Sequence, residues 1–483
     1  MALRLHTSFI NGKRLVNSGR IVKRRNPGQL NQEVSRYRET SEESAEMAMG
    51  SGANAFAAWS DKPLTHRVKI LESVLASLDA RSEKIATLIT RENGKTLPES
   101  RAEVAAGIAD SRFHLKDALR SSKQRIRSAV PDTRAHLQHE PVGVFLLITP
   151  WNFPLATILR KLVPALVFGN TVVVKPSEYT SATASVLFDI LASQKLPAGV
   201  ANLVLGSGPV LGPALIKHDA LRGISFTGST ENGLLIANSV AGRDVRLQLE
   251  MGGKNSLLVL ADADIDSAVD SAVVGAFSCA GQWCTGTGRV IVEDSIYDDF
   301  CQRLIKRAEQ IVVGPGHIPS TRMGPLISSG RLKSARQAVR TAIHEGAKLA
   351  CGGKKPRLRS GWDGHYLAPT IITEVNESMT VFADELFAPV LPVVRARDFE
   401  DGLRLANRGT LGLSASIFTE DRTKANEFLK KVEAGIAHVN LHTAFRVPDL
   451  PISGWRDSGR GIPECGRFGR DFYTRPRSVY LKT

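Results

Sequence analysis

The 483-residue sequence has few cysteines, no long apolar run and no recognisable metal-ligand cluster. Its five cysteines are an odd number spread over a long chain without a CxxC pair, which argues for a reducing compartment rather than a disulfide scaffold. The apolar run 142–148 stops at Thr149 and is far shorter than the ~18 residues of a membrane span. The N-terminal stretch 1–15 lacks an apolar signal core. We therefore expect a cytoplasmic protein with no membrane contact and no metal.

Acidic residues are fewer than basic residues: the chain has 48 Asp and Glu and 63 Lys and Arg, which gives a net charge of +15. Basic residues are spread along the chain in short groups such as 23–25, and neither an RNA-binding motif nor a stripe of basic and aromatic residues is present. We expect no nucleic-acid partner. The charge then reflects a solvated basic surface, or it steers an anionic substrate or cofactor toward a cleft.

The pattern of the chain is that of an α/β protein with two or three domains, as its length also suggests. β-rich segments at 142–148, 171–175 and 224–228 alternate with helical segments, as a doubly wound sheet requires. Helical periodicity is clear over 42–59 and again from 64 through 91. The segment 123–140 contains Pro131 and breaks this alternation, so we expect it to be an excursion from the sheet.

The segment FSCAGQWCTGTGR, 277–289, offers a candidate nucleophile in Cys284. Three nearby glycines, Gly281, Gly286 and Gly288, leave the backbone bare enough for a ligand to approach. A cysteine at the start of a loop or helix gains acidity from nearby backbone N–H groups. The alternative is a buried cysteine that fills space among small residues.

Four further segments resemble strand ends that lead into turns: ITPWNFP (148–154), NTVVVKPSE (170–178), ISFTGST (224–230) and LEMGGKN (249–255). Asn152 lies between two aromatic residues, where its amide needs partners, and it either caps a turn or binds a ligand. Glu250 precedes a Gly-Gly turn, where it is either a general base or an ion-pair partner at the end of an element.

In this order and spacing the motifs TPWNFP, KPSE, FTGST, LEMGGKN, GQWC and DELFAPV resemble the NAD(P)-dependent aldehyde dehydrogenase superfamily over nearly the whole chain. The resemblance implies a Rossmann-like cofactor domain (1–122 and 142–252) and an α/β catalytic domain (253–467). It also implies a small β oligomerisation element (123–141 and 468–483), in which a hairpin pairs with the C-terminal strand across the interface of a homodimer or homotetramer.

The resemblance also implies the chemistry. Cys284 attacks the aldehyde carbon, and the Asn152 amide with the Cys284 backbone N–H binds the resulting oxyanion. Glu250 activates the water that hydrolyses the thioester, with a pKa that burial can raise. Lys161 and Glu464 match positions assigned to proton relay or orientation.

The expected cofactor is NAD, with NADP possible, because Glu178 accepts a hydrogen bond from the adenine ribose and repels a 2′-phosphate. Ser229 is expected where the pyrophosphate meets a helix N-terminus. Ala388 replaces the glycine that is common after the phenylalanine of this motif. The full set of expected cofactor-binding residues is Thr149, Trp151, Lys175, Ser177, Glu178, Gly228, Ser229, Glu385 and Phe387.

For the substrate, a small-molecule aldehyde, Arg160 matches a position where relatives that oxidise acid-bearing semialdehydes carry arginine, and Arg446 lies in the segment that lines the entrance. A guanidinium suits a carboxylate, although each arginine can instead pair with a structural carboxylate. Trp283, beside the nucleophile, either narrows the substrate tunnel or favours a flat aromatic aldehyde. We expect a small or medium aldehyde with a distal anionic group. The alternatives are a neutral aromatic or aliphatic aldehyde, transfer of the thioester to CoA, which Glu250 argues against, and a catalytically silent relative.

Overall fold

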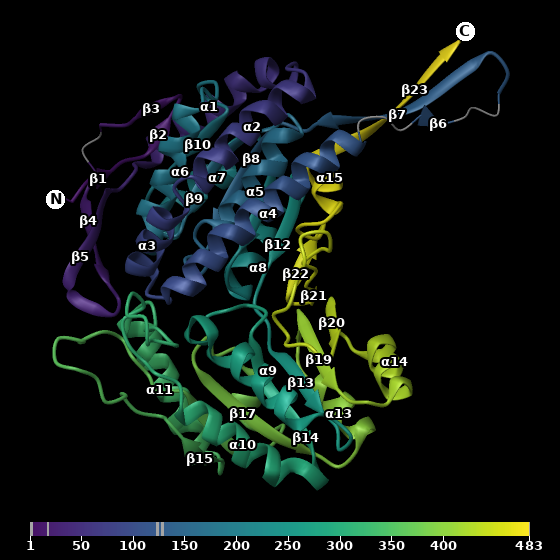
Figure 1. The fold of residues 1–483 in the computed structure, drawn as a ribbon. Helices are drawn as coiled ribbons and strands as arrows, with labels where there is room; N and C mark the ends of the chain where they lie inside the picture. The colour runs from purple at the N-terminus through teal and green to yellow at the C-terminus, as the bar shows by residue number, and fades with distance from the viewer. Residues whose placement is uncertain (1–2, 17–18, 122–124, 127–129, 483) are drawn as a thin grey trace.

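The protein is described here by a computed structural model that covers residues 3–16, 19–121, 125–126 and 130–482. Two sheets with helices packed on them form the body, and a narrow β-arm that carries the C-terminus at its tip extends from it (Figure 1). The predicted α/β class is confirmed. In the described part of the chain, no helix combines the length and apolar composition needed to cross a membrane.

The first sheet has five parallel strands at its centre, in the order β12 (Arg246–Glu250), β11 (Leu221–Thr227), β8 (Val144–Thr149), β9 (Thr171–Pro176) and β10 (Ala201–Leu203). Antiparallel strands extend it at both edges: β22 (Gly459–Gly461), β2 (Phe9–Ile10) and β3 (Lys13–Arg14). The segments that predicted β8, β9 and β11 are largely buried because helices cover both faces of the sheet.

The strand register aligns the carboxyl ends of the central strands along one edge. Ile148 pairs with Phe226, Thr149 with Pro176, and Thr227 with Glu250. The chain leaves β8 for β9 on one side and returns later to β11 on its other side. Open α/β sheets bind ligands at such a topological switch, so the turns after β8 and β11 lie where a ligand is expected.

Helices connect these strands: α5 (Ala156–Val167), α6 (Ser181–Ser193), α7 (Gly208–Lys217) and α8 (Thr230–Ser239). Before the sheet, α1 (Glu42–Ser60) matches the helix expected over 42–59. The helical pattern over 64–91 is divided into α2 (Leu64–Asp79) and α3 (Ser82–Asn93), followed by α4 (Leu97–Ser121). The buried Leu78 and Ile85 flank the break at a spacing of seven residues, which preserves helical periodicity and hides the change of helix.

The second sheet has the order β15 (Lys348–Cys351), β16 (Thr370–Val375), β17 (Val390–Ala396), β14 (Thr287–Glu293), β13 (Asn255–Val259), β19 (Ser414–Phe418) and β20 (Ile436–Val439). All neighbours except β15 and β16 are parallel. The helices of this half are α9 (Ile265–Phe277), α10 (Tyr297–Glu309), α11 (Ser329–His344), α12 (Thr380–Ala383), α13 (Phe399–Ala406) and α14 (Arg422–Lys431). Their apolar faces and the strands share one continuous core.

The arm consists of β7 (Thr133–Pro141) paired antiparallel with β23 (Thr474–Lys482), with β6 (Arg125–Ile126) beside β7 (Figure 1). The positions 122–124 and 127–129 of the expected excursion lie outside the described residues. Before β23, α15 (Phe468–Tyr473) packs the rings of Phe472 and Tyr473 against Phe145 of β8. The domain boundaries stay a prediction. The remaining strands form two smaller sheets: β1 (Leu5–His6), β5 (Gln29–Arg38) and β4 (Ile21–Asn26) in one, and β18 (Leu411–Gly412) and β21 (Trp455–Arg456) in the other.

Candidate active site

A cavity of about 460 Å³ lies between the two halves. It is bounded by the turns after β8, β11 and β12 of the first sheet and by the loops before β14 and β17 of the second. The predicted site residues in its lining are Trp151, Asn152, Arg160, Gly228, Ser229, Trp283, Cys284, Glu385, Phe387 and Arg446. The others are not part of the lining: Thr149, Lys161, Lys175, Ser177, Glu178, Glu250 and Glu464.

Cys284 is half-buried in the loop between the 3-10 turn η2 (Ser278–Gly281) and β14. Its carbonyl accepts a 2.7 Å hydrogen bond from Nδ2 of Asn255. Upstream, Cys279, Ala280 and Gly281 have φ values of 53°, 56° and 70°, which two non-glycine residues rarely adopt in succession. A Cβ at Gly281 would lie 2.3 Å from the carbonyl oxygen of Ala388. Gly281 is therefore needed for close backbone packing that holds the cysteine loop.

The thiol of Cys284 is not acidified in this environment, contrary to what its position in the sequence suggested. Burial raises its pKa to about 12, and the carboxylate of Glu385 contributes in the same direction. The guanidinium of Arg160 and the backbone N–H of Thr285 oppose this effect without overcoming it. At neutral pH the group is a thiol, so attack on a carbonyl requires that its proton be transferred to a base.

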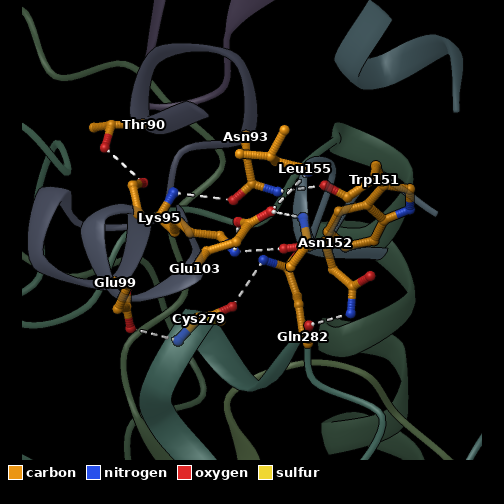
Figure 2. A network of polar contacts seen from close by, with 12 residues as sticks. Thr90, Asn93, Lys95, Glu99, Glu103, Trp151, Asn152, Leu155, Cys279 and Gln282 are labelled. Carbon is orange, nitrogen blue, oxygen red and sulfur yellow. Dashed lines mark hydrogen bonds and ion pairs between the residues drawn. The ribbon is translucent and has the colours of Figure 1, made fainter. Parts of the chain in front are cut away.

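Asn152 is buried in the turn after β8, and its Nδ2 donates a 3.0 Å hydrogen bond to the carbonyl of Gln282 (Figure 2). Gln282 lies two residues before the nucleophile candidate, so this bond links the turn after β8 to the cysteine loop. Asn152 and Cys284 both line the cavity. The second hydrogen of the Asn152 amide nitrogen is available for an oxygen bound there.

Glu250 ends β12 and is buried, with the backbone N–H of Glu464 3.4 Å from its Oε1. Within the described residues its Oε2 has no hydrogen-bond partner. Burial raises the pKa of Glu250 well above its ordinary value, and the neighbouring Glu464 raises it further. An unpartnered carboxyl oxygen with a raised pKa suits a group that accepts a proton from water.

Lys161, on α5, and Glu464 form a buried ion pair next to β11 of the first sheet. Lys161 Nζ lies 2.6 Å from Oε1 of Glu464 and 3.0 Å from Oγ of Ser225. Burial acts to raise the pKa of Glu464, but Lys161 and Arg160 together hold it below its ordinary value. The carboxylate therefore stays charged next to Glu250 and disfavours a second negative charge there.

Arg160 and Arg446 meet at Asp110, a residue that was not singled out from the sequence. Asp110 Oδ2 accepts from Arg160 Nε at 3.2 Å and from Arg446 Nη1 at 3.0 Å, and its Oδ1 accepts from Arg446 Nη2 at 2.7 Å. Arg160 Nη1 also lies 3.6 Å from Glu464. Both guanidiniums thus line the cavity and pair with a structural carboxylate at the same time.

A signal for Asp110 was present in the sequence. Glu103, Asp110 and His114 occupy one face of α4 at spacings of seven and four residues, and all three are buried. Charged residues on the core-facing side of a helix are rarely fully buried unless they are paired. Recognising that face, however, requires knowing which side of α4 meets α5.

On the cofactor side, Ser229 forms the N-cap of α8, and its Oγ accepts from the backbone N–H of Asn232. Lys175 is buried at the end of β9 with its Nζ 4.0 Å from Glu178, and burial lowers its pKa. Ser177 caps the turn that begins at Glu178. These groups have the chemistry that a nucleotide needs: a helix N-terminus for phosphate, and a cation beside a carboxylate for ribose hydroxyls.

Glu385 and Phe387 close the cavity from the second half. Glu385 Oε1 accepts a 3.1 Å hydrogen bond from the backbone N–H of Gly253, and burial raises its pKa. The ring of Phe387 meets Trp151 edge-on at 5.6 Å, and its φ is 50°. Thr149, at the end of β8, is buried.

Among the described residues, no group of three His, Cys, Asp or Glu side chains is placed to hold a metal ion.

Comparison with known proteins identifies related sequences and structures over the whole chain. The model of the aldehyde dehydrogenase family matches residues 16–479. An α-ketoglutaric semialdehyde dehydrogenase of Bacillus subtilis is 36% identical over 478 residues, covering 99% of this chain and 98% of the relative. An α-ketoglutarate semialdehyde dehydrogenase of Haloferax volcanii is 36% identical over 475 residues, covering 98% of each.

A solved structure with the same fold is the betaine aldehyde dehydrogenase of Staphylococcus aureus in complex with NAD+. It superimposes with a TM-score of 0.95 at 32% sequence identity, and the match covers all of this chain and 96% of that one.

Proposed function

Because the chain belongs to the aldehyde dehydrogenase family and is an NAD-dependent oxidoreductase, we propose that it oxidises a small or medium aldehyde carrying a distal anionic group. The observation that carries this proposal is the pair of guanidiniums, Arg160 and Arg446, in the lining of the cavity that also contains Cys284. Both relatives named above act on a semialdehyde with an acidic end, which supports the same substrate class.

The charge balance around the two arginines favours a monoanion. The buried cluster contains three cations and two carboxylates with lowered pKa values: Lys161, Arg160, Arg446, Asp110 and Glu464. Glu250, whose pKa is raised by burial and by Glu464, is not counted in this cluster. One positive charge is therefore in excess, and a carboxylate of the substrate neutralises it through charge-assisted hydrogen bonds to the guanidiniums.

The residues present support the oxidation in two stages. In the first, Glu250, whose charge acts on the Cys284 thiol, accepts the thiol proton and later releases it to solvent. The sulfur forms a bond to the aldehyde carbon, and the amide of Asn152 with the Cys284 backbone N–H stabilises the oxyanion. Bound NAD would supply the hydride acceptor for that carbon. In the second stage, Glu250 accepts a proton from water as the water attacks the thioester at Cys284 and releases the carboxylic acid. Glu464 and Lys161 orient the side chain of Glu250 and set its pKa.

Bound NAD would be held by groups that already suit it. Ser229 and the N-terminus of α8 would receive the pyrophosphate, and Lys175 with Glu178 the adenine ribose. Glu385 and Phe387 would hold the nicotinamide end. Glu178 favours NAD over NADP, because its carboxylate repels a 2′-phosphate.

The second candidate is a neutral aromatic aldehyde. The ring of Trp283 lies 5.4 Å from that of Phe153 in a tilted pair, and both line the cavity beside Cys284. Phe445 adds a third aromatic wall residue. Such walls bind a flat ring by burial of apolar surface.

The test is NADH formation by the purified protein with succinic semialdehyde, longer ω-carboxy aldehydes, and neutral aliphatic and aromatic aldehydes, each with NAD and NADP. Cys284→Ala should abolish turnover. Arg160→Leu should lower the ratio of kcat/KM for acidic to neutral aldehydes by at least about tenfold, since a charge-assisted bond contributes about 1.5–3 kcal/mol. An unchanged ratio would remove the anionic-substrate proposal but leave the aldehyde chemistry intact.

We also propose that the protein is a cytoplasmic homodimer or homotetramer. The arm carries the exposed Tyr480 and Leu481, which suit contact with a second copy. All five cysteines are free thiols, as a reducing compartment favours. Light scattering during size-exclusion chromatography would report the mass of the assembly. A monomer would contradict the proposal.

A further inference from the structure

A second buried ion pair lies directly behind Asn152. Nζ of Lys95 is 2.9 Å from Oε2 of Glu103, and their side chains are 1% and 0% exposed. Lys95 follows the left-handed Gly94, which ends α3, and Glu103 lies on α4. Burial acts to lower the pKa of Lys95, but the Glu103 carboxylate raises it above its ordinary value, so the ammonium is charged.

The ammonium of Lys95 binds the backbone of the turn after β8. It donates to the carbonyl oxygen of Asn152 (Figure 2). It also lies 3.9 Å from the centre of the Phe153 ring. Nδ2 of Asn93, the last residue of α3, donates a 2.8 Å bond to the carbonyl of Trp151. Two successive carbonyls of the turn are thus held by two side chains of the segment 93–95, which fixes the two peptide planes on either side of the Asn152 Cα.

Glu103 binds the other end of the same turn. Its Oε1 accepts from the backbone N–H of Leu155 at 2.8 Å and from that of Ala156 at 3.2 Å. These are among the unpaired donors at the start of α5, where a carboxylate is favourable. A single ion pair therefore holds the turn at residue 152 and at residues 155 and 156.

The segment 93–103 also contacts the cysteine loop. Oε1 of Glu99 accepts a 2.6 Å bond from the backbone N–H of Cys279, while Asn152 Nδ2 reaches the carbonyl of Gln282 (Figure 2). The turn that carries the amide and the loop that carries Cys284 are thus held against one another by the same element. Neither Lys95 nor Glu103 bonds to the side chain of Asn152, so any effect on the amide passes through the backbone.

We propose that Lys95, with Glu103 as its counter-ion, is a positioning residue that keeps the Asn152 amide directed at the oxyanion formed on Cys284. This inference rests on the oxyanion role of Asn152 in the proposed function. A misplacement of about 1 Å in a catalytic group costs roughly 10²-fold in rate. Loss of an oxyanion donor costs about 10²- to 10³-fold. Lys95 therefore acts on kcat by way of Asn152.

The experiment is a double-mutant cycle on kcat with Lys95→Met, Asn152→Ala and the two combined. We expect Lys95→Met to lower kcat about 10²-fold and to change the KM for NAD by less than about threefold. In the Asn152→Ala background, Lys95→Met should have almost no further effect, because the amide that it positions is absent. A purely structural lysine would instead add its full loss in both backgrounds. Lys116→Met, at an exposed position on α4, is the matched control.

The outcomes separate the two hypotheses. Losses that multiply, or a wild-type kcat in Lys95→Met, overturn the positioning role while leaving that of Asn152 intact. An Asn152→Ala enzyme with wild-type kcat, alongside an inactive Cys284→Ala, overturns the oxyanion role itself. If Lys95→Met does not fold because Glu103 is left uncompensated, Lys95→Met with Glu103→Gln provides a neutral buried pair and carries the same cycle.

Discussion

Replacement of Glu464 by glutamine probes the electrostatic control of the proposed general base. In the native protein Glu464 is ionised, since Lys161 and Arg160 lower its pKa, and its charge helps to raise the pKa of Glu250. Glutamine retains an oxygen for the Lys161 ammonium and the backbone N–H that approaches Glu250, but it removes the negative charge. The charge of Lys161 is then uncompensated and also favours ionised Glu250.

The expected effect is a shift of the acid limb of kcat toward lower pH. Glu250 must be ionised to accept a proton, so activity is lost as the pH falls through its raised pKa. An opposite charge next to a carboxyl lowers its pKa by about 1 to 3, and a like charge raises it. We therefore expect the limb to move by about one pH unit, which corresponds to about tenfold higher kcat at a pH well below the native pKa.

The assay is kcat between mildly acidic and alkaline pH at saturating NAD and aldehyde, with pre-steady-state NADH formation to identify hydrolysis of the thioester as the slow step. Glu250→Gln should be inactive in turnover at every pH. Glu46→Gln, at an exposed position on α1, is the control. An acid limb in Glu464→Gln that is unchanged, or that moves toward higher pH, would refute the assignment of Glu464 as the group that raises the pKa of Glu250.

Three further predictions concern single groups. Inactivation by iodoacetamide through Cys284 should accelerate about tenfold per pH unit from neutral to about pH 10, because burial raises its pKa to about 12; a plateau near neutral pH would contradict this. Gly281→Ala should lower the free energy of unfolding by more than about 2 kcal/mol, through its positive φ and the contact with the Ala388 carbonyl, as measured by urea unfolding. Gly242 has a φ of +81° and open space around it, so Gly242→Ala should lower the free energy of unfolding only by the cost of the positive φ, about 1 kcal/mol. Glu178→Gln should raise kcat/KM with NADP relative to NAD by about tenfold; no change in that ratio would exclude Glu178 as the selector.

Local patterns along the chain were enough to predict the elements that carry the site. The strands β8, β9 and β11 follow from short, mainly apolar segments that end in turn residues, and the ordered motifs around Asn152, Glu250 and Cys284 predicted the family. Such features depend on neighbours a few residues away, which the sequence displays directly. The one local error in the helices came from α2 and α3, whose apolar spacing continues across the break.

Tertiary packing decided which groups meet and how they titrate. Lys161 and Glu464 are 303 residues apart, and Arg446 is 336 residues from Asp110, so neither pair can be predicted from residue spacing in the sequence. The same holds for Lys95 and Asn152, which meet only because α3 and α4 pack against the turn after β8. The pKa of Cys284 depends on burial and on charges from distant segments, and the sequence suggested the wrong direction for it. Residue identity determined the chemistry that is available to this chain, whereas desolvation and long-range contacts, which exist only in the folded state, determined the state of each group.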